Sequence, residues 1–168
     1  VILGAGFGGM AAARQLANDK NARVTLVNDT LTFRYNPALY RAATGYKRRL
    51  AVLDIADLIA DMKNVQFIHD SAQHINRHER TIVLQSGQKL TYDYVIIALG
   101  VITSYFGIPG VKEHAYSIKT SHGLAEFQTH LHRQIAEEGH PDAHYVVVGG
   151  GPTGLELAAT LGDYVEQI

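Results

Sequence analysis

Residues 1–29 read VILGAGFGGMAAARQLANDKNARVTLVND, and this stretch decides the fold. Residues 1–3 are apolar, which is typical of a buried parallel strand. A glycine-rich turn follows, then a helix of mostly small residues from Gly8 to about Lys20, then a second apolar strand at Arg23–Val27. A strand, a turn, a helix and a strand within roughly 30 residues predict a βαβ unit with a right-handed crossover.

The turn has the pattern G-x-G-x-x-G between Gly4 and Gly9. Gly4 permits the tight turn, Gly6 lets a pyrophosphate approach the backbone, and Gly9 lets helix and strand pack closely. The phosphates would meet N–H groups at the positive end of the helix dipole. We therefore expect the turn to bind a dinucleotide through Gly4, Gly6, Phe7, Gly8 and Gly9. The alternative is a glycine-rich turn that serves packing alone.

A ribose-binding acidic residue is expected about 20 positions after such a turn. The sequence offers Asn28 and Asp29 there. Asn28 stands where the second strand ends, and its amide oxygen can accept a hydrogen bond. Asp29 comes one residue later and can also reach a ribose. The alternative for Asp29 is a solvated turn residue.

A second glycine fingerprint occupies residues 149–154, between a predicted strand at 144–148 and a predicted helix from Leu155 onward. Two such turns in one chain indicate two dinucleotides, or one cofactor and one co-substrate. The ribose-binding residue of the second turn would fall some 20 positions after it, beyond the last residue of the sequence, so NAD and NADP are not distinguished.

Between the two turns the pattern is mixed. We predict an irregular stretch at 29–50, a short helix capped by Asp54, and a helix from Ser121 to Glu138 that Gly139 and Pro141 end. Short strands separated by turn signals are predicted at 65–68, 73–75, 81–84 and 94–98. The apolar stripe of the long helix is expected to consist of Leu124, Phe127, Leu131 and Ile135.

Composition narrows the classes of function. Apolar residues make up 46% of the chain and charged residues 18%, with 16 glycines, which suits an α/β protein rich in tight turns. A net charge of -1 gives no reason to expect nucleic acid as a partner. There is no cysteine, and the nine histidines lack metal-ligand spacing, so we predict no metal site and no thiol chemistry. No apolar run reaches the roughly 18 residues that span a bilayer.

The chain starts inside a predicted strand and stops inside a predicted helix, so we expect it to belong to a longer protein. The basic cluster at 47–49 reads KRR and has two interpretations, a solvated loop or a contact with anionic lipid.

Four stretches resemble the flavoproteins of the pyridine nucleotide–disulfide reductase superfamily, and most of all their type II NADH dehydrogenase branch, the NADH:quinone oxidoreductases. These stretches are VILGAGFGGMAAARQL, VTLVNDTLTFRYNPALYRAATG, TYDYVIIALGVITSYFGIPGV and YVVVGGGPTGLELAATL. The resemblance implies an α/β fold: a Rossmann-like FAD-binding domain with a parallel sheet and a β-meander at 1–110. Residues 111–168 would then hold a connector helix and the first βα unit of a second Rossmann-like domain, which binds NAD(P)H.

The resemblance also implies roles at the first site. The first turn would hold the FAD pyrophosphate, and Asn28 with Asp29 would hold its adenosine ribose, although the family usually has an acidic residue at the position of Asn28. The other implied FAD contacts are Asn36 and Pro37 close to the flavin, Ala72 at the adenine, and Ala98, Leu99 and Gly100 in the motif that closes the strand beside the cofactor. Leu99 stands where Thr is common.

At the second site the resemblance implies an NAD(P)H pyrophosphate bound by Gly149, Gly151, Pro152, Thr153 and Gly154. Glu156 matches an acidic residue near the flavin and nicotinamide, where it tunes hydride transfer or quinone protonation. The alternative for Glu156 is a carboxylate stabilised by the helix dipole regardless of catalysis. Thr160 stands where relatives often carry a second acidic residue.

The lack of cysteine separates branches of the superfamily, because its disulfide reductases carry C-x-x-x-x-C where this chain reads YRAATG at 40–45. We therefore expect an FAD-dependent oxidoreductase that takes hydride from NAD(P)H and passes electrons to a quinone without a cysteine relay. The alternatives are a reductase with a soluble acceptor and a non-catalytic dinucleotide-binding module. The expected setting is cytoplasmic, peripheral on the inner face of the cell membrane through later segments, and compatible with a homodimer. Residues 1–168 alone are expected to lack turnover.

Overall fold

The computed structural model describes residues 1–17, 19–44, 51–137 and 144–167. The predicted basic cluster at 47–49 and the predicted helix stop at Gly139 and Pro141 lie outside these residues. The chain divides into two compact units, which are described separately. Unit 1 comprises residues 1–34 and 53–101, and unit 2 comprises residues 35–52 and 102–168.

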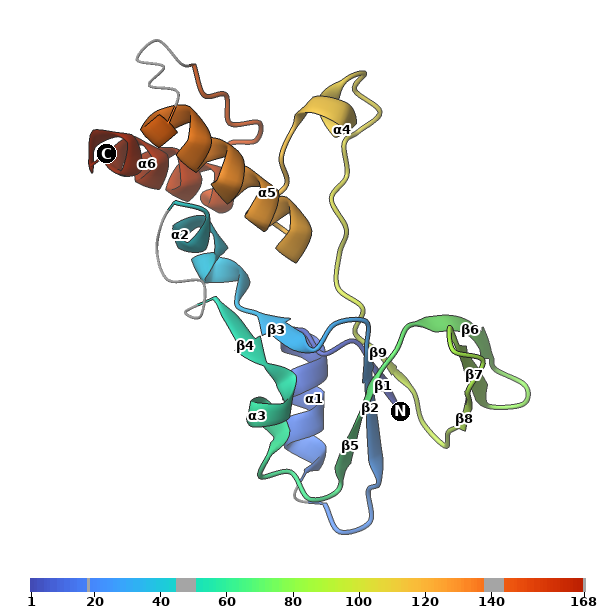
Figure 1. The fold of residues 1–168 in the computed structure, drawn as a ribbon. Coiled ribbons are helices and arrows are strands. Elements are labelled where there is room, and N and C mark those ends of the chain that lie inside the picture. Colours follow the sequence, from blue (N-terminus) through green and yellow to red (C-terminus); the bar gives the residue numbers. More distant parts are fainter. Residues whose placement is uncertain (18, 45–50, 138–143, 168) are drawn as a thin grey trace. The chain divides into compact units, whose positions relative to one another are not determined.

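Unit 1 is built on a four-stranded parallel sheet (Figure 1). Its strands, in spatial order, are β5 (Val65–His69), β2 (Val24–Asn28), β1 (Ile2–Leu3) and β9 (Ile96–Ile97). Because all four strands run the same way, their carboxyl ends meet at one edge of the sheet. The first glycine turn follows β1 at that edge.

The two faces of the sheet are covered by different elements. Ile2 and Leu26 are buried on one face in a cluster with residues of helix α1 (Phe7–Leu16). Leu3 and Val27 are buried on the other face against the antiparallel meander of β6 (Ala72–Asn76), β7 (Thr81–Leu84) and β8 (Lys89–Thr91). Figure 1 shows α1 and the meander on opposite sides of the sheet. Successive residues of a strand point to opposite faces, so even the two-residue β1 contributes to both cores. The predicted α/β class, with parallel sheet and meander, is confirmed.

The remaining elements of unit 1 are helix α3 (Ile55–Ile59) and a two-stranded ribbon of β3 (Thr32–Arg34) and β4 (Val52–Asp54). Strands β3, β4 and β8 were not predicted, and the first helix ends at Leu16, earlier than expected. Asp54 does precede α3, but its side chain caps no N–H group in the described part of the chain, so that prediction is wrong. The backbone N–H of Ile55 instead donates to the carbonyl of Leu31 at 2.9 Å.

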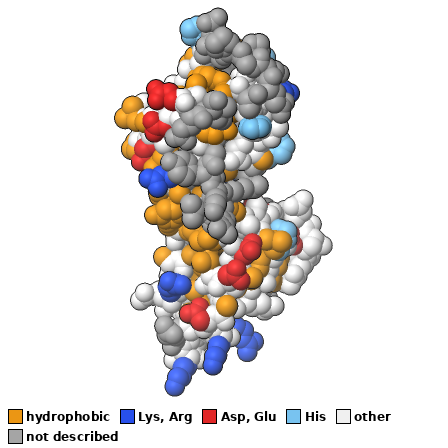
Figure 2. All heavy atoms as spheres, turned by 60° about the vertical axis from the view of Figure 1, so that its left-hand side comes forward, with side chains coloured by type: hydrophobic (Ala, Val, Ile, Leu, Met, Phe, Trp, Pro, Cys, Tyr) orange, Lys and Arg blue, Asp and Glu red, His pale blue; other side chains and the backbone are white. Residues whose placement is uncertain are grey.

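Three exposed basic residues of unit 1 lie away from the glycine turn. Lys20, Arg23 and Lys63 are exposed and precede β2 or β5. Figure 2 shows Lys and Arg side chains gathered at the lower end of the visible face. The amino ends of parallel strands lie opposite their carboxyl ends, so these three cations do not contribute to a phosphate site at the turn.

Apart from Val52 of β4, the regular elements described in unit 2 are helices and helical turns. It contains a 3-10 turn (Asn36–Ala38) and helices α2 (Leu39–Ala43), α4 (Val111–His114), α5 (Ser121–His132) and α6 (Pro152–Gln167), with a π turn (Arg133–Glu137) after α5. The 3-10 turn and α2 lie where an irregular stretch was predicted. Leu39, Ala42 and Leu124 are buried in one cluster, against which Leu157 packs. The Gln128 side chain also donates a hydrogen bond to the carbonyl of Ala42, which ties α2 to α5.

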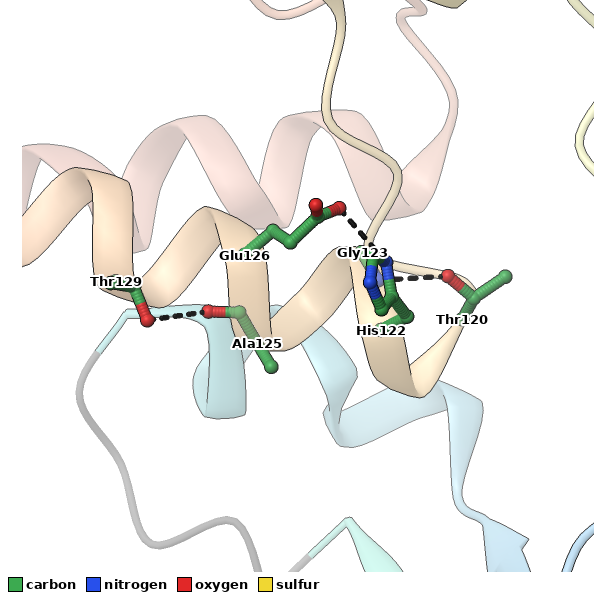
Figure 3. A network of polar contacts seen from close by, with 6 residues as sticks. All are labelled: Thr120, His122, Gly123, Ala125, Glu126 and Thr129. Carbon is green, nitrogen blue, oxygen red and sulfur yellow. Dashed lines mark hydrogen bonds and ion pairs between the residues drawn. The ribbon is translucent and has the colours of Figure 1, made fainter.

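Helix α5 begins with a side-chain cap and continues with an ion pair (Figure 3). The Thr120 hydroxyl accepts a hydrogen bond from the backbone N–H of Gly123 at 3.0 Å. From the same first turn, the Nδ1 of His122 lies 3.0 Å from a carboxylate oxygen of Glu126 on an exposed face. The predicted apolar stripe lies on the inner face, with Leu124 and Leu131 buried and Phe127 and Ile135 half-buried.

The predicted strand at 144–148 is not formed, because no described residue pairs with it. Its side chains are open to solvent, with Val146 84% and Val148 72% exposed. A strand needs a neighbour to accept and donate its backbone hydrogen bonds, and the described chain supplies none at this place. No helix among the described residues is both long and apolar enough to cross a membrane.

Candidate dinucleotide-binding site

The first glycine turn is held tightly between β1, β2 and the end of β9. Gly4 has a φ of +96°, a conformation that favours glycine, and its N–H donates to the carbonyl of Val27 at 2.7 Å. A Cβ atom at Gly4 would collide with the carbonyl of Ala98, and one at Gly9 would collide with the carbonyl of Gly4. The two glycines therefore allow the helix to start directly against the strand, as the fingerprint predicts.

Gly6 differs from these two glycines because the space beside it is open. A Cβ atom there would meet no described atom within 4 Å, and its φ of -76° suits any residue. Gly6 is the N-cap of α1, and within the described residues no side chain caps the helix start. An uncapped helix start beside an open glycine is the arrangement that suits a diphosphate.

Asn28 holds the turn from the end of β2. Its Oδ1 accepts a hydrogen bond from the N–H of Ala5 at 2.8 Å. Its Nδ2 donates to the carbonyl of Thr30 at 2.9 Å and to the hydroxyl of Thr30 at 3.0 Å. The side chain thus joins two loops at the carboxyl edge of the sheet, so its predicted ribose contact would have to share an oxygen that already has a partner.

A hollow of about 200 Å³ opens at this edge, in unit 1. Five of the predicted cofactor residues line it, namely Gly4, Asn28, Asp29, Ala72 and Leu99. The other lining residues are Leu3, Val27, Asp70 and Ser71. Asp70 and Ser71 were not predicted, although their place directly after β5, at the carboxyl edge, could have indicated them.

Asp70 lines the hollow with a carboxylate whose oxygens already accept hydrogen bonds. The carboxylate accepts hydrogen bonds from the backbone N–H of Ser86 at 3.3 Å and of Ser71 at 2.7 Å. A hydrogen bond from the Ser86 side chain lowers the pKa of the Asp70 carboxyl from its usual value, and backbone hydrogen bonds from Ser71 and Ser86 lower it further. Asp70 therefore connects the start of β6 to the β7–β8 turn while it faces the hollow.

The predicted motif after β9 adjoins the first turn. The N–H of Ala98 donates to the carbonyl of Leu3 at 2.8 Å, and the Ala98 methyl would lie 3.7 Å from a Cβ atom at Gly8. Leu99 is 65% exposed and Gly100 has a φ of +76°. The structure thus brings Ala98 and Leu99 against the first fingerprint, with Gly100 directly after them in the chain.

The second glycine turn has the same backbone shape as the first. Gly149 has a φ of +115°, and a Cβ atom at Gly154 would collide with the carbonyl of Gly149. Helix α6 begins with a bond from the N–H of Leu155 to the carbonyl of Gly151 at 3.1 Å. The counterpart at the first turn runs from Met10 to Gly6 at 2.9 Å.

The other predicted site residues of unit 2 are exposed to solvent. Pro152 and Thr153 begin α6, while Asn36 and Pro37 form the 3-10 turn before α2. Glu156 lies in α6, and the carboxylate has no partner among the residues that the structure describes, whereas its carbonyl accepts from the Thr160 hydroxyl at 2.9 Å. No group of three or more candidate metal ligands occurs in the described ranges.

Comparison with known proteins places these turns in a family. The sequence profile of pyridine nucleotide-disulphide oxidoreductases matches residues 1–168. The chain is 29% identical to an external alternative NADH-ubiquinone oxidoreductase of Yarrowia lipolytica, over 99% of this chain and 32% of that protein. It is 33% identical to a sulfide-quinone reductase of Aquifex aeolicus, over 90% of this chain and 34% of that protein.

A solved structure agrees with the sequence matches. The NDH2 of Plasmodium falciparum, determined in complex with NADH, aligns with a TM-score of 0.84 and 26% identity, over 99% of this chain and 37% of that one. The chain thus spans about a third of the length of the relatives it matches. The predicted superfamily is confirmed, since the chain belongs to the pyridine nucleotide-disulphide oxidoreductase family.

Proposed function

We propose that this chain is the part of an NAD(P)H:quinone oxidoreductase that binds FAD at its first glycine turn and begins the NAD(P)H site at its second. The observation that carries this proposal is the repetition of one backbone shape. Both turns combine a positive-φ glycine, a helix that starts against it, and a glycine without room for a Cβ atom. The family is FAD-dependent and uses NAD(P)H.

The first turn fits a dinucleotide on three counts. The start of α1 carries no side-chain cap within the described chain, Gly6 leaves open space, and the adjoining hollow suits an adenosine. Gly4, Gly6, Phe7, Gly8 and Gly9 would hold the pyrophosphate. Phe7 is itself steadied by an edge-to-face contact with Phe33, with ring centroids 5.2 Å apart.

The remaining site residues would serve the flavin and the nicotinamide. When bound, FAD supplies the redox chemistry, accepting a hydride from the nicotinamide and releasing electrons to an acceptor. Asn36 and Pro37 would border the flavin, and the exposed carboxylate of Glu156 would hold a proton near the reacting rings. The second turn would hold the NAD(P)H pyrophosphate through Gly149, Gly151, Pro152, Thr153 and Gly154.

A quinone is the acceptor that the relatives favour. Both sequence relatives are named as quinone reductases, one oxidising NADH and the other sulfide. The absence of cysteine from residues 1–168 favours NADH as the donor, because it leaves this part of the chain without a thiol to form a bond to sulfur. A mitochondrial or cell membrane, where quinones reside, is the proposed setting.

The test uses the full-length protein that carries these residues. NADH added without oxygen should bleach the flavin absorbance, and menadione or a ubiquinone analogue should restore it. A protein that holds FAD but is not bleached would be a binding module and would contradict the proposal. A protein that is bleached, but reoxidised by ferredoxin or oxygen and not by quinones, would contradict the acceptor alone.

A further inference from the structure

We propose that the side chains of Asp70 and Ser71, which directly follow β5, recognise the edge of the nucleotide base in the hollow of unit 1 and make it specific for adenine. The Asp70 carboxylate accepts a hydrogen bond from the exocyclic amino group, and the Ser71 hydroxyl donates to the neighbouring ring nitrogen. Both residues line the hollow together with Gly4, whose turn holds the diphosphate in the proposed function. The inference rests on that proposed FAD site and adds a base-specific contact to it.

The Asp70 carboxylate is held in place without any ligand. One oxygen accepts from the N–H of Ser71 at 2.7 Å, and the other accepts from the N–H of Ser86 at 3.3 Å. The Ser86 hydroxyl is a further donor to it. A carboxylate offers about four acceptor positions, so one remains for a donor in the hollow.

The surrounding backbone keeps this carboxylate from turning away. The N–H of Asp70 donates to the carbonyl of Asn28 at 3.0 Å, which fixes Asp70 against β2. On the other side, the N–H of Gln85 donates to the carbonyl of Ser71 at 2.8 Å and thereby holds the β7–β8 turn against the start of β6. Because hydrogen bonds lower the pKa of the Asp70 carboxyl, it is ionised at neutral pH and only accepts.

Ser71 supplies the complementary donor. Its backbone N–H and carbonyl are engaged by Asp70 and Gln85, whereas its hydroxyl has no hydrogen-bond partner among the residues that the structure describes. A fixed acceptor beside a free hydroxyl matches adenine, which presents an amino group next to a ring nitrogen that accepts. Guanine and hypoxanthine present a carbonyl oxygen in place of that amino group, and this oxygen would face the carboxylate.

Asp29, the other carboxylate of the hollow, lacks this support. It is exposed, and its side chain makes no hydrogen bond or ion pair within the described part of the chain. A side chain without fixed direction does not discriminate between bases, because it can turn away from an unfavourable group. Asp70 is therefore the carboxylate in the hollow that is able to select a base.

The test compares nucleotides that differ in the purine base. Full-length apoprotein is titrated with FAD, whose uptake is followed by flavin fluorescence, in competition with ADP, purine riboside diphosphate or IDP. All three competitors carry the same ribose diphosphate, so contributions of the glycine turn cancel in their ratios. Purine riboside diphosphate lacks the amino group and should compete about tenfold less well than ADP, the scale of one hydrogen bond to a charged group. IDP places an acceptor at the same position and should compete more weakly than either.

Variants assign the contacts to side chains. Asp70→Ala should remove the differences among the three competitors, and Asp70→Asn, whose amide can direct a donor to the carbonyl of hypoxanthine, should raise IDP at least to the level of ADP. Ser71→Ala should weaken ADP and purine riboside diphosphate alike, by roughly two- to tenfold, and keep their ratio. Asp61→Asn makes the same exchange at an exposed residue before β5 and, as the matched control, should change none of these ratios.

Equal competition by ADP and purine riboside diphosphate in the unmodified protein overturns the assignment while the FAD site stands. A preference for ADP over IDP that persists in Asp70→Asn does the same, and this variant decides the matter if Asp70→Ala does not fold. Unchanged competition by ADP in Ser71→Ala removes Ser71 from the base contact. Absence of FAD uptake by the unmodified apoprotein overturns the proposed function, and this inference with it.

Discussion

Gly6 and Gly9, which flank the start of α1, give opposite predictions when each is replaced by alanine. Gly6→Ala places a methyl group where no described atom lies within 4 Å, with a φ that alanine accepts. Alanine is a poorer N-cap than glycine, which destabilises the fold by up to about 1 kcal/mol. Alanine also lowers the conformational entropy of the unfolded chain, which stabilises the fold by roughly 0.4–1 kcal/mol. The apoprotein should therefore keep its stability within about 1 kcal/mol.

The effect of Gly6→Ala on FAD affinity should be much larger than its effect on stability. The methyl group would occupy the side from which the pyrophosphate approaches, and displacement of one phosphate from a backbone N–H loses about 1.5–3 kcal/mol. Since each 1.4 kcal/mol is tenfold, FAD affinity should fall roughly 10- to 100-fold. In Gly9→Ala the methyl group meets the Gly4 carbonyl, a backbone atom that cannot yield, so the fold itself should lose about 1–3 kcal/mol.

Two measurements decide the matter, thermal unfolding of the apoproteins by circular dichroism and FAD titration by flavin fluorescence. The expected outcome is a stable Gly6→Ala protein that binds FAD poorly and a Gly9→Ala protein that melts early. If Gly6→Ala binds FAD as tightly as the unmodified protein, the pyrophosphate does not lie at this turn. If Gly9→Ala melts normally, the proposed contact between the helix start and β1 is wrong.

Four further outcomes are expected. Gly151→Ala should keep FAD but slow flavin reduction by NADH at least tenfold in stopped-flow experiments, because its methyl group enters the space of the second turn; unchanged reduction would place NADH elsewhere. Asn64→Ala should lower the free energy of unfolding by about 1–3 kcal/mol in urea, because its Nδ2 donates to three carbonyls at and after the end of α1; Asn64→Asp, which keeps the size but not the donors, should not rescue it. Thr120→Val should cost about 1 kcal/mol through loss of the α5 cap, and Thr120→Ser should recover most of it in the same urea titration. Hydrogen bonds lower the pKa of the Asp70 carboxyl in the folded state. The ionised carboxyl therefore stabilises the fold above its ordinary pKa of 3.8, and this stabilisation is lost as the pH falls through the lowered pKa. The difference in free energy of unfolding between the unmodified protein and Asp70→Asn should accordingly shrink in acid.

The βαβ unit and the two turns could be predicted because their determinants are local. Glycine spacing, small helical residues and apolar strands stand within a short stretch, and the structure places Gly4 and Gly9 in the contacts that this spacing requires. The parallel pairing of the first two strands follows from the same reasoning, whereas the β-meander was expected from the resemblance to the family.

What was missed depends on partners that are distant in sequence. The side chain of Asn28 holds a peptide 23 positions earlier, and no local pattern reveals that bond. Strand β3 was missed because its pairing partner is β4, which follows only after α2 and a further stretch of chain. The strand at 144–148 was predicted from an apolar run, but a run of valines specifies a strand only where neighbours supply hydrogen bonds.

The turn at 149–154 keeps its shape although the segment before it belongs to no ladder in the described chain. Six residues and the first turn of α6 therefore suffice for this backbone shape, without a paired strand before them in the described chain. On the proposed function, the same six residues placed after another strand would keep the shape that receives a phosphate, and residues of the neighbouring strands would select the nucleotide.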